Sequence, residues 1–189
     1  MKKTKQRVDR RVRRTQRGLR EALISLILER GWDAVTVRDV CEAADVGRST
    51  FYVHFADKEN LLLSGFDELQ AEMAGHARGA TVPFGFAEAL LAHALENRRL
   101  FRAMVGRQSG QQMQWRFRDV LVTLIGHELG SLKVPPGSRA ATAAFLAGGF
   151  MEQLLNALDG EPNDASAAVL AGRFTRLAMG AVGAARAGL

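Results

Sequence analysis

Apolar side chains recur at intervals of three and four residues along almost the whole chain, and this spacing constrains the fold more than any other feature. Residues with such spacing share one face of an α-helix, whereas a half-buried strand requires strict alternation. The sequence has no alternating stretch and few β-branched runs, and Gly or Pro interrupts the pattern at helical spacing. The chain is therefore predicted to be all-α.

Glycine and proline divide this pattern into segments. Gly31 follows the first segment, the Pro135-Pro136-Gly137 turn separates two later ones, and residues 160–163 form another break. Glycine often ends helices and proline disfavours helix in the residue before it, so these positions mark helix boundaries. The expected helices cover about residues 9–30, 37–44, 48–54, 57–79, 84–95, 97–106, 110–131, 137–158 and 164–186.

Positive charge is concentrated at the start of the chain. Residues 1–58 carry 14 Lys or Arg and eight Asp or Glu, whereas residues 59–189 carry 12 of each, so the first segment holds the whole formal net charge of +6. A polyanion such as DNA attracts such a segment through the release of counterions. On charge alone, a nucleic-acid-binding segment and a basic, solubilising tail are equally good interpretations.

One stretch has the pattern of two short helices joined by a tight turn. Thr36 precedes apolar residues spaced i, i+3, i+4 and i+7, and Asp39 stands three positions after it, which is the spacing of a capping box. Asp45-Val46-Gly47 is a three-residue turn in which Asp45 suits the left-handed conformation. Phe51 and Phe55 face inward from the second helix. This arrangement predicts a helix-turn-helix.

The outward side of this motif carries hydrogen-bond donors and one apolar residue, Val53. The candidate DNA-binding residues are Thr36, Arg38, Arg48, Ser49, Tyr52, His54 and Lys58. Arg38 and Arg48 are long enough to reach a guanine edge in the major groove. Taken singly, these arginines fit an ordinary solvated surface, but their placement on one helix-turn-helix favours base contact.

The remaining candidates suit the DNA backbone. Tyr52 and His54 can donate to backbone oxygens, although a core-edge tyrosine and a structural histidine are the alternatives. Asp57 is expected to cap the next helix, where free N–H groups and the Lys58 cation together favour a phosphate. Thr36 is expected to cap the first short helix whether or not it contacts DNA. The arginines near the N-terminus could track phosphates or enter the adjacent minor groove.

The stretch TVRDVCEAADVGRSTFYVHFADKENLL, within Gln16–Leu63, resembles the DNA-binding domain of the TetR/AcrR family of bacterial transcriptional regulators. The resemblance covers about a quarter of the chain, and its core of Thr-Phe-Tyr-x-His-Phe-x-x-Lys is specific. The matching residues are Thr36, Val40, Ala44, Val46, Thr50, Phe51, Tyr52, His54, Phe55, Lys58 and Leu61. Two positions depart from the family pattern, because Asp45 replaces its usual turn glycine and Gly47 its usual serine cap.

The resemblance implies how the motif would meet DNA. The helix-turn-helix would dock in the major groove, with Arg38, Arg48 and Ser49 where the family often reads bases. The positions where the family holds phosphates are Thr36, Tyr52, His54 and Lys58. The domains implied are a helix-turn-helix DNA-binding domain with a basic N-terminal arm, residues 1–65, and a helical effector-binding and dimerisation domain, residues 66–189.

The last two expected helices are rich in small residues, which permit close helix approach. Their small residues are Ala140, Ala143, Ala144, Ala147, Gly148, Ala165, Ala168 and Gly172, and their large ones are Phe150, Met151, Leu154, Leu155 and Leu158. Two such helices from each subunit would form a four-helix interface in a homodimer. The alternative is that they pack only inside one subunit. A two-fold dimer would read two half-sites and so gain specificity.

A ligand pocket in the second domain has weaker support, because most large apolar residues of a helical domain form its core. The candidates are Phe66, Met73, Phe86, Phe101, Met104, Met113, Trp115 and Phe117. The resemblance implies a small-molecule effector, and these residues would suit a predominantly apolar one.

Catalytic and membrane functions find little support. Glu72 with His76, and His93 with Glu96, share helical faces but lack a second matching pair, so no metal site is expected. No nucleophile motif, phosphate loop or dinucleotide fingerprint occurs, so neither enzymatic activity nor a cofactor is expected. The single Cys41 allows no internal disulfide, and apolar runs are too short to cross a bilayer. These features predict a cytoplasmic protein without a membrane partner.

The sequence as a whole predicts a homodimeric, sequence-specific regulator that binds a near-palindromic operator in double-stranded DNA. We expect a repressor released by a small, predominantly apolar effector. The alternative is a helical architectural or interaction protein that binds nucleic acid without sequence preference. Preference for a specific duplex over a random one would distinguish the two.

Overall fold

The computed structural model describes residues 2–79, 82–106, 111–161 and 165–188. In these residues all regular secondary structure is helical, which confirms the predicted all-α class. The chain separates into two compact units, Met1–Gly65 and Phe66–Leu189, and the boundary falls within the fourth helix.

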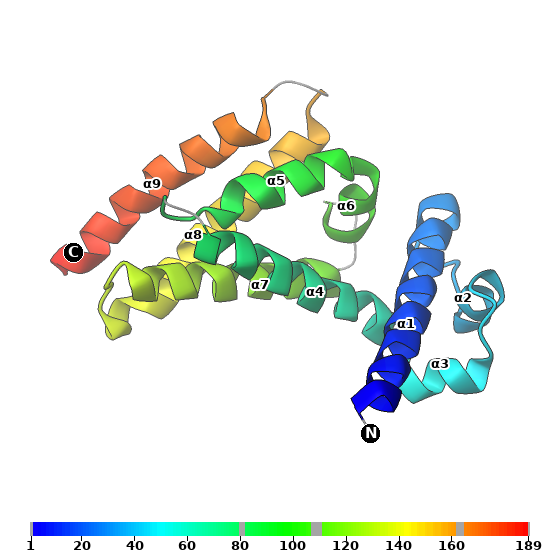
Figure 1. Ribbon diagram of the computed structural model, residues 1–189. Coiled ribbons are helices and arrows are strands. Elements are labelled where there is room, and N and C mark those ends of the chain that lie inside the picture. Colours follow the sequence, from blue (N-terminus) through cyan, green and yellow to red (C-terminus); the bar gives the residue numbers. More distant parts are fainter. Residues whose placement is uncertain (1, 80–81, 107–110, 162–164, 189) are drawn as a thin grey trace. The chain divides into compact units, whose positions relative to one another are not determined.

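The N-terminal unit contains α1 (Lys2–Arg30), α2 (Val37–Ala43), α3 (Arg48–His54) and the beginning of α4 (Lys58–Gly79), as Figure 1 shows. Its core consists of apolar side chains from all four helices. The buried residues are Leu19, Leu23, Leu26, Ile27, Val35, Val40, Cys41, Phe51, Phe55, Leu61 and Leu62. The inward positions predicted for Phe51 and Phe55 are confirmed.

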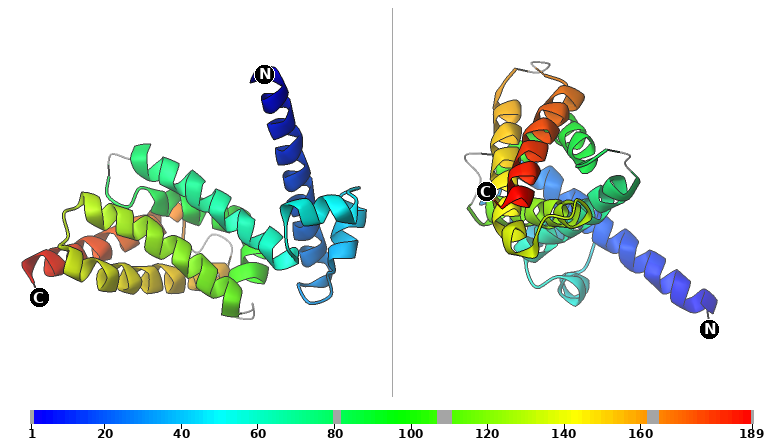
Figure 2. Two further views of the ribbon diagram at one scale, coloured as in Figure 1. Left: turned by 90° about the horizontal axis from the view of Figure 1, so that it is seen from below. Right: turned by 90° about the vertical axis from the view of Figure 1, so that its left-hand side faces the viewer.

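Helix α1 begins at Lys2, whereas the sequence pattern predicted a start near residue 9. The additional turns are rich in Lys, Arg and Gln, which are good helix formers, and contain no Gly or Pro. The basic segment is therefore helical and not an extended arm, and it projects beyond α2 and α3 (Figure 2). At the other end, Gly31 adopts a left-handed conformation with φ 80° and donates its N–H to Ile27 O at 2.9 Å.

Local hydrogen bonds define the helix-turn-helix as predicted. Thr36 Oγ1 accepts from the Asp39 N–H at 3.2 Å, and the Thr36 N–H donates to Asp39 Oδ2 at 2.8 Å, so the capping box is confirmed. Asp45 is left-handed with φ 52°, and Val46 N–H donates to Cys41 O at 3.0 Å. The expected turn geometry is thus present without the usual glycine.

The second unit contains the remainder of α4 together with α5 (Phe86–Glu96), α6 (Arg98–Val105), α7 (Gln111–Ser131), α8 (Pro136–Asp159) and α9 (Ala167–Ala187). Within it α8 packs against α7 and α9, and α5 packs against α9 (Figure 1). Phe150 links these helices, because its ring centre lies 6.1 Å from that of Phe86 and 5.0 Å from that of Phe174. Aromatic packing of this kind adds to the stabilisation from buried area.

Candidate nucleic-acid interface

Helix α3 presents one side to the core and the other to solvent. Phe51 is completely buried, whereas Tyr52 is 51% exposed and Val53 is 78% exposed. Arg48 and Ser49 are exposed at the start of the same helix. We call these four exposed residues, Arg48, Ser49, Tyr52 and Val53, the α3 face. The ring of Tyr52 packs edge-on against Phe51 at 5.4 Å, which limits where the tyrosine can lie.

An open hollow of about 450 Å³ separates α2 from the start of α3. Arg38 and Arg48, the two predicted base-contacting residues, both line it. Arg38 Nε donates to Glu42 Oε1 at 2.7 Å, and this hydrogen bond raises the pKa of the Arg38 guanidinium above its ordinary value. Both side chains are largely exposed, so the ion pair between Arg38 and Glu42 is weak. Arg38 can therefore leave Glu42 for another hydrogen-bond acceptor. Cys41 also borders the hollow, and burial raises the pKa of its thiol.

Thr36 and His54 lie at opposite ends of the helix-turn-helix. The Thr36 hydroxyl donates to Asp39 Oδ2 at 2.6 Å, and these hydrogen bonds hold the pKa of the Asp39 carboxyl below its ordinary value. The polar groups of Thr36 therefore serve the cap of α2. His54 is half-buried at the end of α3, with its ring centre 6.3 Å from that of Phe55.

Lys58 differs from Thr36 and Arg38 because its ammonium group bonds to residues that are distant in the chain. Nζ donates to the main-chain oxygens of Trp32 and Val35, at 2.7 Å in both cases, and lies 4.3 Å from the centre of the Trp32 ring. Asp57 Oδ1 accepts the N–H of Asn60 at 2.6 Å, so the predicted cap of α4 is present. The internal contacts of Lys58 were not evident from the sequence, since its partners lie 26 and 23 residues away.

A second open groove of about 700 Å³ lies between α1 and the turn that connects α2 to α3. The exposed residues Arg11, Arg14 and Arg17 line its α1 side, and Val46 belongs to the opposite wall. The sequence identified these arginines as part of a basic segment. Their position beside the helix-turn-helix depends on how α1 packs against α2.

Most of the proposed effector-pocket residues belong to the packed interior of the second unit. Phe117 lies between two other candidates, with ring-centre distances of 5.9 Å to both Phe66 and Phe101. Met73, Phe86 and Met113 are buried, Met104 is half-buried, and Trp115 is 64% exposed. The structure thus brings several candidates together as packed core and places Trp115 at the surface.

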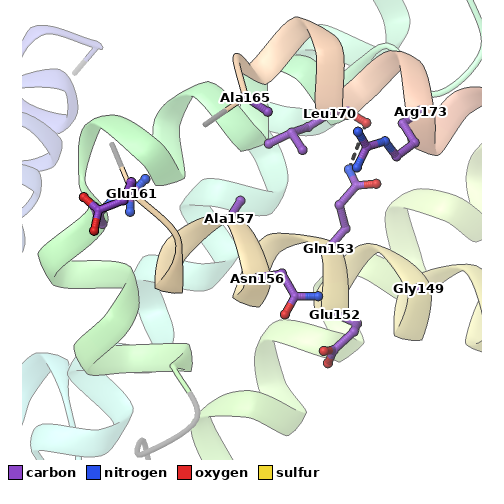
Figure 3. Close-up of a pocket in the computed structure, with 10 residues that line it drawn as sticks. Gly149, Glu152, Gln153, Asn156, Ala157, Glu161, Ala165, Leu170 and Arg173 are labelled. Carbon is purple, nitrogen blue, oxygen red and sulfur yellow. Dashed lines mark hydrogen bonds between the residues drawn. The ribbon is translucent and has the colours of Figure 1, made fainter. Parts of the chain in front are cut away.

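A hollow of about 560 Å³ lies instead at the C-terminal end of α8, beside the beginning of α9 (Figure 3). Gln153 reaches from α8 to α9, where its Nε2 donates to Leu170 O at 2.8 Å. Arg98 of α6 donates to Leu158 O at 3.1 Å and to Gly160 O at 2.6 Å, which satisfies carbonyls at the end of α8. None of the sequence-derived pocket candidates lines this hollow.

The small and large residues of α8 and α9 differ in their burial, and several are half-buried. The buried ones include Ala143, Ala147, Phe150, Leu154, Leu155 and Leu158. A second set is exposed, and it includes Phe145 at 71% and Leu177 at 69%. We call the exposed set Phe145, Gly148, Gly149, Val169, Leu177 and Gly180 the α8–α9 face. Packing inside the chain therefore accounts for the first set and leaves the second exposed.

In the described part of the chain, no helix is long and apolar enough to span a membrane. Among the same residues, no group of three or more His, Cys, Asp or Glu side chains is arranged to hold a metal ion.

The fold and the α3 face define an all-α protein with an N-terminal helix-turn-helix unit. The sequence model of the family described as "Bacterial regulatory proteins, tetR family" matches residues 19–64. The predicted resemblance to the TetR family is confirmed: the chain carries the N-terminal domain of that family, and its fold is similar to that of TetR-family regulators.

Two curated relatives from Bacillus subtilis (strain 168) are described as uncharacterized HTH-type transcriptional regulators. YxbF is 34% identical over 98 residues, which cover 48% of this chain and 26% of YxbF. YwcC is 36% identical over 63 residues, which cover 33% of this chain and 27% of YwcC. The matched segments thus span about a quarter of the length of these relatives.

Solved structures extend the similarity to most of the chain. A TetR transcriptional regulator from Streptococcus agalactiae 2603V is 25% identical, with a TM-score of 0.67 over 90% of this chain and 96% of that chain. The TetR-family repressor FadR from Thermus thermophilus, crystallised with lauroyl-CoA, is 19% identical, with a TM-score of 0.61 over 87% of this chain and 93% of that chain. The second similarity concerns the fold alone.

Proposed function

We propose that this protein is a homodimeric, sequence-specific DNA-binding transcriptional regulator that acts in the cytoplasm. The observation that carries the proposal is the α3 face, where Tyr52 and Val53 are exposed on a helix whose other side is anchored by buried Phe51. Exposed donors with one apolar contact, on a short helix held by a turn, suit the major groove.

Different parts of the N-terminal unit would supply specificity and affinity. Arg38 and Arg48, which line the hollow between α2 and α3, would contact base edges, together with Ser49. Tyr52 and His54 would bind backbone oxygens and set the position of α3. Thr36 would help by capping α2, whose first turn it organises.

The arginines of α1 would bind phosphates on the DNA flanking the helix-turn-helix. Arg11, Arg14 and Arg17 are exposed in the groove that borders the turn between α2 and α3. A helix is too wide to enter the minor groove of B-DNA, which is about 6 Å across. The helical form of this segment therefore favours contact with the phosphate backbone over insertion of an extended arm.

The second unit, residues 66–189, would provide the dimer contact and the effector site. The α8–α9 face carries two large side chains, Phe145 and Leu177, beside glycines that would allow helices of a second copy to approach closely. A two-fold pair would present two α3 helices to a near-palindromic operator.

We further propose repression that is relieved by a small molecule with a large apolar part. The described core around Phe117 is tightly packed, so an apolar ligand would have to separate its rings. The similar FadR from Thermus thermophilus was crystallised with lauroyl-CoA, which combines an acyl chain with a polar carrier. Release of DNA requires that the effector bind one conformation more tightly than the other.

Selection of bound duplexes from a random pool tests the function directly. A regulator of this kind should enrich one near-palindromic sequence and bind it about a thousandfold or more tightly than random duplex. Equal affinity for the selected and random duplexes at every salt concentration would instead support a non-specific architectural protein, whose binding the basic helix α1 would dominate.

A further inference from the structure

The contacts of Lys58 use most of the hydrogen-bonding capacity of its ammonium group. Two of its three N–H donors are directed at the main-chain oxygens of Trp32 and Val35, each at 2.7 Å. The Trp32 ring, 4.3 Å away, adds a cation–π attraction. The lysine is also partly buried, so a phosphate would have to displace these contacts to bind it.

The surroundings at the start of α4 are also unfavourable for a phosphate. Asp57 Oδ1 accepts the Asn60 N–H at 2.6 Å, so a carboxylate already occupies the place at this helix terminus where an anion would bind. A phosphate beside Lys58 would meet this negative charge.

The two carbonyl partners show what the lysine connects. Val35 is buried and immediately precedes Thr36, the N-cap of α2, while Lys58 follows α3 as the first residue of α4. The hydrogen bond from Lys58 to Val35 therefore joins the two ends of the segment 36–57, which contains the whole helix-turn-helix. Because the bond spans 23 residues, it closes a long loop of the chain.

We propose that Lys58 is a positioning residue that ties the two ends of the helix-turn-helix together, and that it does not bind a DNA phosphate. This inference rests on the proposed DNA-binding function. Loss of the tie would allow α2 and α3 to shift relative to α1, which would impair base contacts more than non-specific attraction.

Salt dependence separates the two roles. We would measure binding of Lys58→Met and Arg17→Gln to a random duplex across a salt series, with Arg17→Gln removing one exposed cation of the α1 groove. A residue that binds a phosphate contributes about 0.9 to the slope of log affinity against log salt. We expect Lys58→Met to keep the wild-type slope. A slope reduced by about 0.9 in Lys58→Met would overturn the proposal.

Discrimination between duplexes separates positioning from simple stabilisation. We expect Lys58→Met to bind the selected duplex about tenfold more weakly, a loss similar to that of one base contact, with little change on random duplex. A lysine that only stabilised the fold would reduce both affinities in proportion to the folded fraction. Equal losses on the two duplexes would therefore also contradict the positioning role.

Amine labelling of the unmodified protein gives a test that does not depend on the folding of a variant. In the absence of DNA, we expect Lys58 to react about tenfold or more slowly than the exposed Lys133, because its ammonium is tied to carbonyls. Random duplex should leave the Lys58 rate unchanged. A Lys58 that reacts as fast as Lys133 and becomes protected only by duplex would refute the inference. If no duplex binds at all, the proposed function fails, while labelling of the free protein still tests the tie.

Discussion

The α3 face and the α8–α9 face both expose large apolar side chains, but their neighbours differ. Tyr52 and Val53 stand beside Arg48 and Ser49, whereas Phe145 stands in α8 with Gly148 and Gly149 on the same exposed face. Hydrogen-bond donors and a cation around an apolar side chain suit the major groove of DNA, which presents acceptors and thymine methyl groups. Large side chains beside glycines suit another helix. The difference indicates that exposure alone does not identify a partner, and that the surrounding side chains decide its chemistry.

Removing a fully buried aromatic ring beneath each face should have the largest effect on stability. Phe51→Ala and Phe150→Ala each delete a fully buried ring, and each should lower the free energy of unfolding of its unit by about 3–5 kcal/mol. Chemical denaturation followed by circular dichroism would measure this, with Val53→Ala as the exposed control. We expect Phe51→Ala to abolish duplex binding and leave dimerisation intact. Loss of dimerisation in that variant would show that the two regions are not independent.

Charge introduced on the α8–α9 face should separate the subunits. Leu177→Glu would place a carboxylate where we expect a dry contact with a second copy, at a cost of about 2 kcal/mol or more in dimer affinity. Sedimentation velocity over a range of concentrations would report the change, with a Glu substitution of the exposed Arg118 in α7 as a control. An unchanged dimer in Leu177→Glu would place the interface elsewhere on the molecule.

Changing one cation of the α3 face should alter sequence preference. Arg48→Ala should lose about 1–3 kcal/mol of discrimination at a single base pair of the selected duplex. Competition binding against duplexes with single substitutions would locate that base pair. The corresponding change on α7, Arg118→Ala, should leave discrimination unchanged. A uniform loss across all duplexes would indicate that Arg48 contacts the backbone.

The smallest effect is expected at the cap of α2. Thr36→Ala should lower the free energy of unfolding by about 1 kcal/mol at neutral pH. Because the folded pKa of Asp39 is lowered, its contribution is present above the ordinary pKa and is lost as the pH falls through the lowered value. The stability difference between Thr36→Ala and wild type should therefore shrink below about pH 4, where carboxylates gain protons. A difference that stays constant in urea denaturation down to about pH 3 would argue against a role for the Asp39 carboxylate.

Prediction from sequence succeeded best where the determining groups are close in the chain. The capping box of Thr36 and Asp39, the left-handed Asp45 and the inward Phe51 and Phe55 all depend on spacings of a few residues. The start of α1 was misplaced because helix-forming residues without a capping signal leave a boundary undefined.

Prediction was weaker in the second unit, where helical periodicity does not say which side of a helix meets which neighbour. Phe145 and Phe150 both occur in α8, yet the first is exposed and the second is buried against Phe86 and Phe174. Trp115 was a pocket candidate on size alone, but it faces solvent at the beginning of α7.

The sequence by itself determined the helical class, the helix-turn-helix and the side of α3 that faces outward, because each follows from hydrogen bonds and apolar spacing within one or two turns. Tertiary structure alone decided that the Lys58 ammonium meets Trp32 and Val35, that the α1 arginines border the turn after α2, and that Phe145 stays uncovered. These features join residues more than twenty positions apart, or depend on the neighbour against which a helix packs. They therefore arise only when the whole unit folds.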